Sequence, residues 1–297
     1  MDHQLQTFIA VAEIKNFTRA AESLHITQAA VTLAIKSLEK KYQVKLIDRT
    51  NKYVRLTNAG EILYFHGKKI LDHYQRVDRL IDDLANNARG DLLIGSSFTF
   101  GEYILPRLLG KFQQLYPEIN PEISISNSSR VLRDVSDGKL DVGIIEGNIT
   151  DNHLLLQSFA KDEMLVILPS NHPLREKNEV DLSELADETW IIREQGSGTR
   201  LAAEQLFEAH HFTPASIRSF GSSQVIKESV EASLGISFLS EWVVQKEVRL
   251  GTIKTTRVKH TPVVRNFSYV LNQTEFRPKT TQLFIDFLST VPYSRLK

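Results

Sequence analysis

The sequence predicts an α/β protein in three parts: a winged helix-turn-helix over residues 1–60, a linker helix over 61–90 and a two-lobed α/β domain over 91–297. Three observations support this division. Apolar residues recur at helical spacing before residue 40, and a proline-free stretch after residue 60 carries an apolar residue every seven positions. From residue 91, strand-like and helix-like segments alternate.

Composition excludes several classes of protein. Lys+Arg and Asp+Glu both number 36, 41% of residues are hydrophobic, and there is no cysteine, which rules out disulfides, thiolate metal sites and a cysteine nucleophile. No segment reaches the roughly 18 consecutive apolar residues that span a bilayer. Residues 1–20 lack the basic start of a secretory signal. We therefore expect a cytoplasmic protein without membrane contact.

The charge is unevenly distributed along the chain. Residues 1–60 hold nine Lys and Arg against five Asp and Glu, so they carry +4 and the remainder carries −4. A basic N-terminal part favours contact with a polyanion such as DNA. A solvated basic face is the alternative explanation.

The first sixty residues show the helix-turn-helix pattern. We expect helices over 3–14, 19–24 and 28–40, with Asn16 or Thr18 capping the second and Thr27 the third. Val31, Ile35 and Leu38 form the core face of the third helix. Short or polar side chains on the opposite face suit a recognition helix in the major groove, and we expect them to contact DNA: Gln28, Ala29, Thr32, Leu33 and Lys36.

A basic hairpin is expected after the third helix. Residues 44–47 and 53–56 resemble two short strands, and the cations on and between them suit the phosphate backbone or the minor groove of double-stranded DNA: Arg49, Lys52 and Arg55. A local salt bridge is the alternative role for either arginine.

The linker segment predicts a dimerisation helix. Leu63, Ile70, Val77 and Leu84 repeat every seven residues, and Tyr74, Leu80 and Ile81 widen the apolar stripe. Pairing with a second copy would bury this stripe. Packing along the chain's own C-terminal domain is the alternative.

Two loops of the α/β domain place hydroxyl groups between a strand and a helix. One carries Ser96, Ser97 and Thr99, and the other carries Ser197 and Thr199. Hydroxyls and free N–H groups at helix starts suit a small oxyanion or carboxylate. We expect both loops to face one cleft between the lobes. Plain helix capping is the alternative.

The N-terminal run from Phe17 to Gly60 resembles the winged helix-turn-helix of LysR-type transcriptional regulators. This chain has Thr32-Leu33-Ala34 where the family usually has Ser-Arg-Gln, so Leu33 lacks a guanidinium and base reading would shift toward a thymine methyl. The shared positions include Ala20, Ala21, Leu24, Thr27, Gln28, Val31, Ile35, Leu38, Glu39, Leu46, Arg49, Leu56, Thr57 and Gly60.

The resemblance implies a DNA-binding regulator that forms a homodimer through the linker helix, and a homotetramer. It also implies a periplasmic-binding-protein-like effector domain whose chain crosses between lobes near 161–164 and 263–268. Lobe I would span about 91–162 and 268–297, and lobe II about 163–267. The runs GEYILP, DGKLDVGIIEG and REQGSGTR are similar to regulators of sulfur assimilation and carbon fixation. Sulfite, sulfate or a serine-derived sulfur precursor are the first effector candidates.

Enzyme signatures are not found: the sequence has no GxSxG, no GxxxxGK[ST] and no HExxH. His25 and the pair His210-His211 lack partners at metal spacing, so we expect no metal and no cofactor. A solute-binding protein or an α/β enzyme is the rival hypothesis, and the helix-turn-helix opposes it. An architectural DNA binder without an effector would not need two α/β lobes.

Overall fold

The computed structural model describes residues 2–49, 53–85, 89–147, 149–259, 264–274 and 276–293. The chain divides into two compact units, Met1–Asp82 and Asp83–Lys297, which we call unit 1 and unit 2 and describe separately.

Unit 1 is built on three helices, a β-hairpin and the start of a long helix. The helices are α1 (Asp2–Ile14), α2 (Phe17–Ser23) and α3 (Gln28–Tyr42). The side chain of Asn16 caps α2 by accepting from the backbone N–H groups of Thr18 and Arg19, and Thr27 Oγ1 accepts from Ala30 N at 3.2 Å to cap α3. The helix-turn-helix and both predicted caps are therefore confirmed. These helices bury a common core of Phe8, Val11, Ala20, Val31, Ile35 and Leu38.

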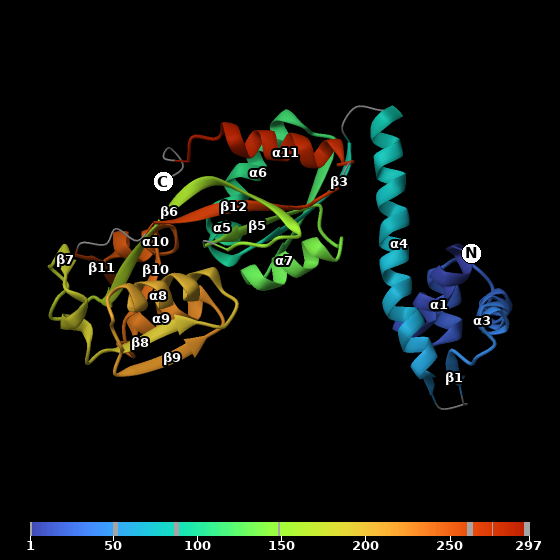
Figure 1. The fold of residues 1–297 in the computed structure, drawn as a ribbon, viewed down its shortest axis with the longest axis horizontal. Helices are drawn as coiled ribbons and strands as arrows, with labels where there is room; N and C mark the ends of the chain where they lie inside the picture. The colour runs from blue at the N-terminus through green and yellow to red at the C-terminus, as the bar shows by residue number, and fades with distance from the viewer. Residues whose placement is uncertain are drawn as a thin grey trace. The chain divides into compact units, whose positions relative to one another are not determined.

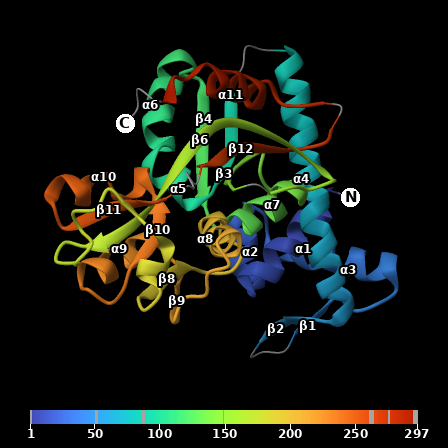
Figure 2. The same cartoon turned by 60° about the vertical axis from the view of Figure 1, so that its left-hand side comes forward.

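The hairpin pairs β1 (Ile47–Arg49) with β2 (Val54–Leu56) in antiparallel register beside the start of α4 (Figure 2). The first strand begins at Ile47 and not at Val44, so the predicted bounds are wrong by three residues. At the start of the strand, Glu39 Oε1 on α3 accepts from Leu46 N at 3.0 Å and from Ile47 N at 3.4 Å. These two bonds connect the beginning of the hairpin to α3, while the Leu46 carbonyl accepts from Thr57 N across the hairpin at 3.0 Å.

The linker helix α4 runs from Asn58 to Ala85 as one continuous helix. Its first turns pack against α1, and a side chain at Gly67 would place its Cβ 2.8 Å from Leu5. Leu63 belongs to the predicted seven-residue repeat, but it packs against the core that α1, α2 and α3 bury. Figure 1 shows α4 continuing beyond the three short helices. Among the described side chains of that part, the exposed apolar residues are Ile70, Tyr74, Val77 and Ile81. The side chain of Leu84, also predicted in the repeat, lies outside the described residues.

The first half of unit 2 confirms the predicted βαβαβ pattern. Strand β3 (Gly90–Ser96) pairs in parallel with β4 (Ile119–Ile125) and with β5 (Val142–Glu146). The connections are α5 (Phe98–Tyr103) with α6 (Leu105–Leu115), and α7 (Ser128–Ser136). With β12 (Val264–Asn272) and α11 (Lys279–Thr290), these elements form what we call the first lobe.

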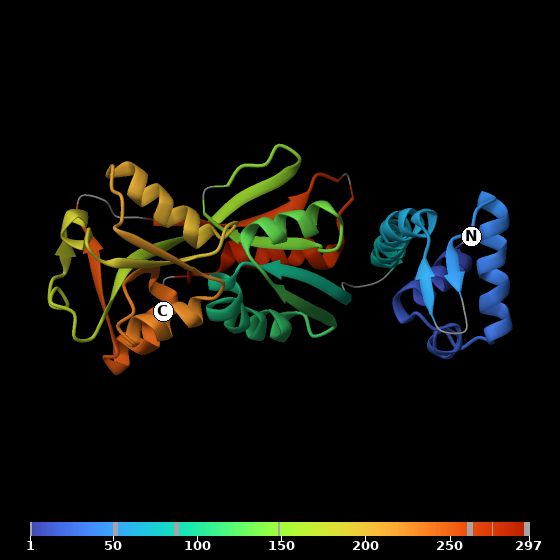
Figure 3. The same cartoon turned by 90° about the horizontal axis from the view of Figure 1, so that it is seen from below.

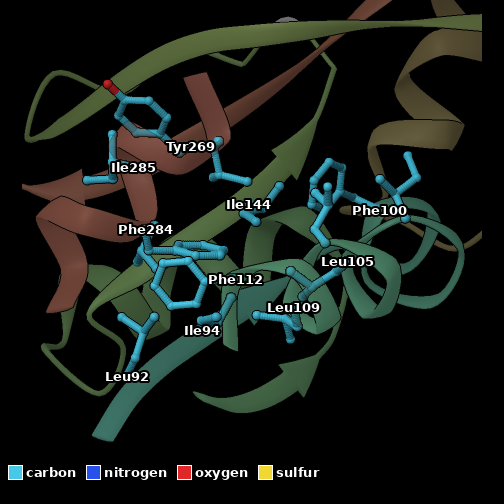
Figure 4. Packing of buried hydrophobic residues seen from close by; sticks show 14 of the residues in the cluster. Leu92, Ile94, Phe100, Leu105, Leu109, Phe112, Ile144, Tyr269, Phe284 and Ile285 are labelled. Carbon is cyan, nitrogen blue, oxygen red and sulfur yellow. The ribbon is translucent and has the colours of Figure 1, made fainter. Parts of the chain in front are cut away.

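Helices cover both faces of the first-lobe sheet. In Figure 1, α6 and α11 lie on one face and α7 on the other. Figure 4 shows Phe112 of α6 and Phe284 of α11 packed together, and their ring centroids are 5.3 Å apart. The cluster also includes Leu92, Ile94, Phe100, Leu105, Leu109, Ile144, Tyr269 and Ile285.

Strand β6 (Leu154–Pro169) is shared by the two halves of unit 2. It pairs with β12 through residues 154–163 and with β10 and β11 through residues 164–169. The strand predicted over 164–168 is therefore the second half of a longer one. Its first half pairs antiparallel with β12, which the sequence pattern did not indicate.

The second lobe, as we call residues 164–259, surrounds the second half of β6. Its strands are β7 (Glu179–Val180), β8 (Thr189–Arg193), β9 (Ser216–Phe220), β10 (Ser237–Ser240) and β11 (Ile253–Val258). Figure 3 shows α8 (Gly198–Ala209) on one side of these strands, with α9 (Ser223–Glu231) and α10 (Glu241–Leu250) on the other. A short 3-10 helix, Leu182–Leu185, precedes β8.

Candidate DNA-binding surface and effector site

The predicted recognition face of α3 is open to solvent in unit 1. Gln28, Ala29 and Lys36 are exposed, and Leu33 is exposed to 67%. Thr32 is half-buried, and its hydroxyl donates to the carbonyl of Gln28 at 3.0 Å. The Thr32 proton is therefore engaged within the helix, while its oxygen can still accept a hydrogen bond from a base.

The wing presents an exposed guanidinium. Arg55 lies opposite Asp48 in the backbone register of the hairpin, and its Cζ lies 4.9 Å from the ring centroid of Tyr53. Arg55 forms no ion pair with any residue of the described ranges, so its charge is not neutralised there. Lys52 and the side chain of Arg49 lie outside the described residues.

The predicted effector residues lie where the two lobes meet. Ser96, Ser97 and Thr99 belong to the end of β3 and the start of α5, and Ser197 and Thr199 belong to the start of α8. All five are buried, with at most 5% of their surface exposed.

Arg265 on β12 brings the two loops together. Its Nη2 donates to Thr99 Oγ1 and its Nη1 to Thr199 Oγ1, both at 3.0 Å. One buried guanidinium thus bonds a threonine from each lobe. Each threonine hydroxyl accepts from Arg265 and retains its own proton to donate.

The three serines differ in their hydrogen bonds. Ser197 Oγ accepts from the backbone of Thr199 at 3.2 Å, so it caps α8, as the capping alternative predicts. Ser96 Oγ donates to the carbonyl of Ser97 at 3.1 Å. Ser97 precedes α5 without a side-chain cap bond, and its buried hydroxyl has no hydrogen-bond partner among the described residues. An unsatisfied buried hydroxyl is costly unless a ligand or water bonds it.

Two acids neutralise Arg265. Its Nε donates to Asp162 Oδ2 and its Nη2 lies against Glu146 Oε2, each at 2.7 Å. Ser240 Oγ donates to the other Asp162 oxygen at 2.6 Å. Burial raises the pKa of Asp162 to about 6, because loss of water disfavours the carboxylate more than Arg265 and Ser240 stabilise it.

Further cations hold α5 against the second lobe. The Arg193 guanidinium lies 4.4 Å from the Phe98 ring centroid, and the Lys227 Nζ lies 5.2 Å from that of Tyr103. Both cations also have carboxylate partners: Arg193 Nε donates to Glu194 at 2.8 Å, and Lys227 Nζ donates to Glu247 at 2.6 Å. Burial raises the pKa of Tyr103, which keeps this phenol protonated.

Sequence reasoning missed Arg265, Asp162 and Glu146. They lie on three strands, and Arg265 is separated from Asp162 by 103 positions. The available signal was a charged residue close to an apolar strand run: Asp162 stands two positions before MLVIL, and Glu146 directly follows VGII. Such charges are seldom buried unless they are paired.

Among the described residues, no cluster of three or more His, Asp or Glu side chains could hold a metal ion. None of the described helices combines the length and the apolarity that crossing a membrane requires.

A helix-turn-helix with an exposed recognition face, followed by a two-lobed α/β domain with a polar junction, is the arrangement of a ligand-responsive transcriptional regulator. Family models match both parts: "Bacterial regulatory helix-turn-helix protein, lysR family" over residues 3–61, and "LysR substrate binding domain" over residues 85–292. The chain belongs to the LysR family. It is a DNA-binding transcriptional regulator with an effector-binding domain.

Its relatives are transcriptional regulators rather than enzymes. The chain is 38% identical to the HTH-type transcriptional regulator CysL of Bacillus subtilis (strain 168) over 98% of both chains. It is 31% identical to a probable RuBisCO transcriptional regulator of Trieres chinensis, over 97% of this chain and 96% of that protein. These relatives agree with the resemblance to sulfur-assimilation and carbon-fixation regulators.

Solved structures show the same fold. CbnR complexed with its target DNA has a TM-score of 0.75 at 21% identity, and the match covers 100% of both chains. The regulatory domain of CcmR from Synechocystis PCC6803, in complex with 2-PG, has a TM-score of 0.62 at 29% identity. That match covers 68% of this chain and 96% of the CcmR chain.

Proposed function

We propose that the three parts of the chain divide the work of regulation. Residues 1–60 bind double-stranded DNA, residues 61–90 pair two copies, and residues 91–297 bind the effector, with lobe I about 91–162 and 268–297 and lobe II about 163–267.

The α3 face reads bases and the wing contacts phosphates through Arg49, Lys52 and Arg55. The exposed stripe of α4 supports pairing, and full-length oligomers are homodimers that associate into homotetramers. DNA binding supports a cytoplasmic location.

The effector site lies at the junction of the lobes and takes a small oxyanion or carboxylate. Ser97, Thr99 and Thr199 donate hydrogen bonds to it, with Ser96 and Ser197 close by. The observation that carries this proposal is the convergence of Thr99 and Thr199 on Arg265 next to the buried, unbonded hydroxyl of Ser97. The CcmR regulatory domain in complex with 2-PG and the QuiR effector domain in complex with shikimate support a small-molecule role.

Binding at this junction would regulate DNA binding through the angle between the lobes. A ligand shifts a conformational equilibrium only by its difference in affinity for the two states. Thr99 belongs to the first lobe and Thr199 to the second, so a ligand bonded to both favours one lobe arrangement. Charge on the ligand would also redistribute the bonds of Arg265.

Calorimetric titration of sulfite, sulfate and small carboxylates against the full-length protein tests the site. We expect wild type to bind one of them and Ser97→Ala to lose that binding. Ser97 is the best position because its hydroxyl makes no bond to a described residue, whereas Thr99→Val would also break a bond to Arg265. Ser289→Ala on α11, whose hydroxyl bonds to Ile285, is the matched control and should bind normally. Equal binding by Ser97→Ala, or binding of no anion, contradicts the proposal.

A further inference from the structure

The exposed face of α3 carries an apolar side chain at its centre. Leu33 is 67% exposed, and Ala29, one turn earlier, is also exposed. The residues that α3 buries are Val31, Ile35 and Leu38. At about 100° per residue, Leu33 lies roughly 160° around the helix from Ile35, so it points away from this core. Contact with another molecule would therefore bury Leu33 without disturbing the fold of unit 1.

The part of the chain that forms the start of this face is uncharged. From Leu24 to Ile35 the sequence has no Lys, Arg, Asp or Glu, and α3 has no arginine at any position. The N-terminal residues of a recognition helix are the ones that meet base edges in the major groove. Guanine presents two acceptors there, N7 and O6, and its commonest readers are arginine and lysine. The base-reading half of α3 lacks both.

Thr32 can only accept a hydrogen bond from a base. Its hydroxyl has one proton, and Oγ1 donates that proton to the Gln28 carbonyl at 3.0 Å. The donors that bases present in the major groove are the 6-amino group of adenine and the 4-amino group of cytosine. Guanine and thymine present only acceptors on this edge. Thr32 therefore favours adenine or cytosine.

The A·T base pair satisfies Thr32 and Leu33 together. It presents the adenine amino group, which can donate to Thr32, and the C5 methyl group of thymine, which can pack against Leu33. A G·C pair presents an amino group but no methyl group. Gln28, exposed at the start of α3, suits the N6 and N7 edge of a further adenine. Three side chains of one face thus favour the same kind of base pair.

We infer that α3 selects an A·T base pair, with Leu33 packed against the thymine methyl group and Thr32 accepting a hydrogen bond from the adenine amino group. The inference rests on the base-reading role proposed above for the α3 face and names what that face reads. Specificity at this base pair comes from an apolar contact and an acceptor, and not from a cation.

Uracil tests the methyl contact, because it keeps the pairing of thymine and removes only the C5 methyl group. Full-length protein selects its sites from random duplex DNA, and each thymine of a selected site is then replaced in turn. We expect one replacement to weaken wild-type binding about fourfold in fluorescence anisotropy, the effect of one buried methyl group. Leu33→Ala should no longer distinguish thymine from uracil at that position. Leu115→Ala on α6, at a leucine that is 62% exposed in unit 2, is the matched control and should respond like wild type.

Two further variants test the hydrogen bond and the role of the missing cation. Replacing the adenine of the same base pair by purine, which lacks the 6-amino group, should weaken wild type about fivefold. The same replacement should leave Thr32→Val unaffected, because valine keeps the shape of threonine without its oxygen. Leu33→Arg should select G·C in place of A·T at this position, because arginine donates to N7 and O6 of guanine. Circular dichroism of each variant checks its folding.

The outcomes separate the inference from the proposed base-reading face. Wild-type binding that no uracil replacement weakens, equal sensitivity of Leu33→Ala and wild type to uracil, or a Thr32→Val variant that still senses the adenine amino group would each overturn the inference. In those cases, selection of a new sequence by Leu33→Arg leaves the proposed face intact. If Leu33→Arg and Thr32→Val both select the wild-type sequence with wild-type affinity, the face itself fails.

Discussion

Arg265 contacts partners that are 66, 103 and 166 positions away in the chain, namely Thr199, Asp162 and Thr99. The sequence indicated the two threonines through their place before or within a helix. It could not indicate their common partner, because the register of β12 against β6 decides which side chains meet. Long-range pairing of this kind has no local signature, and Arg265 alone resembles an ordinary surface arginine.

Replacing Arg265 tests its structural role. Arg265→Met should lower the free energy of unfolding by about 3–5 kcal/mol, because it leaves two carboxylates buried without a cation. Arg257→Met is the matched control. Arg257 pairs with Glu163 at 2.7 Å, but the two side chains are 55% and 32% exposed. The control should change stability by about 0–1 kcal/mol in urea titrations. Equal losses in the two variants would contradict the account.

The raised pKa of Asp162 makes stability depend on pH. Its pKa in the folded protein is about 6 against an ordinary value of 3.8, so the folded state binds the proton more tightly than the unfolded state. The contribution of Asp162 to the free energy of unfolding is therefore fully present below pH 4 and is lost as the pH rises through 6. The total loss is about 3 kcal/mol. The stability advantage of wild type over Asp162→Asn should therefore fall between pH 4 and 7. A constant difference across that range would show that Asp162 is ionised in both states.

At the scale of elements, the sequence predicted helix ends correctly where the hydrogen-bond partner lies within a few residues along the chain. Asn16 and Thr27 cap the helices that they were expected to cap, each within three residues. The start of β1 was predicted three residues too early. Glu39, eight residues before Ile47, accepts from Ile47 N, a bond between helix and strand that the strand pattern alone does not indicate. The first half of β6 was missed because its partner, β12, lies about a hundred residues later.

The wing predicts a measurable salt dependence. Arg55→Ala should weaken binding to all DNA sequences alike and reduce the slope of log affinity against log salt by roughly one, as expected when one phosphate contact is lost. Fluorescence anisotropy at several salt concentrations measures both quantities. Lys111→Ala on α6 makes the same change in charge within unit 2 and should leave the slope unaltered. An unchanged slope in Arg55→Ala would contradict the proposal that the wing contacts DNA phosphates.

The exposed stripe of α4 predicts pairing between copies. Val77→Asp places a charge at a position that is 49% exposed in one chain and would be buried in a seam, so it should break or weaken the oligomer. Sedimentation measures the change. Asp72→Lys, five residues earlier and roughly 140° around the helix, is the control and should sediment as wild type. Wild-type sedimentation of Val77→Asp would exclude pairing through this stripe.

At the scale of the whole molecule, regulation requires that effector binding at the lobe junction and DNA binding by the helix-turn-helix are coupled through the same conformational equilibrium. The family and its two parts followed from the sequence, since the helix-turn-helix run and the α/β rhythm are local patterns. The chemistry of the junction did not, because its charges come from β5, β6 and β12 together. Coupling between two such sites typically changes affinity about 5–150-fold.

The most direct test measures binding to the DNA upstream of the chain's neighbouring genes, with and without the ligand that calorimetry identifies. The account predicts that this ligand changes the DNA affinity of wild type at least about fivefold. Ser97→Ala should keep the ligand-free DNA affinity and lose the change. A ligand effect that persists undiminished in Ser97→Ala would contradict the claim that the junction of the lobes is the effector site.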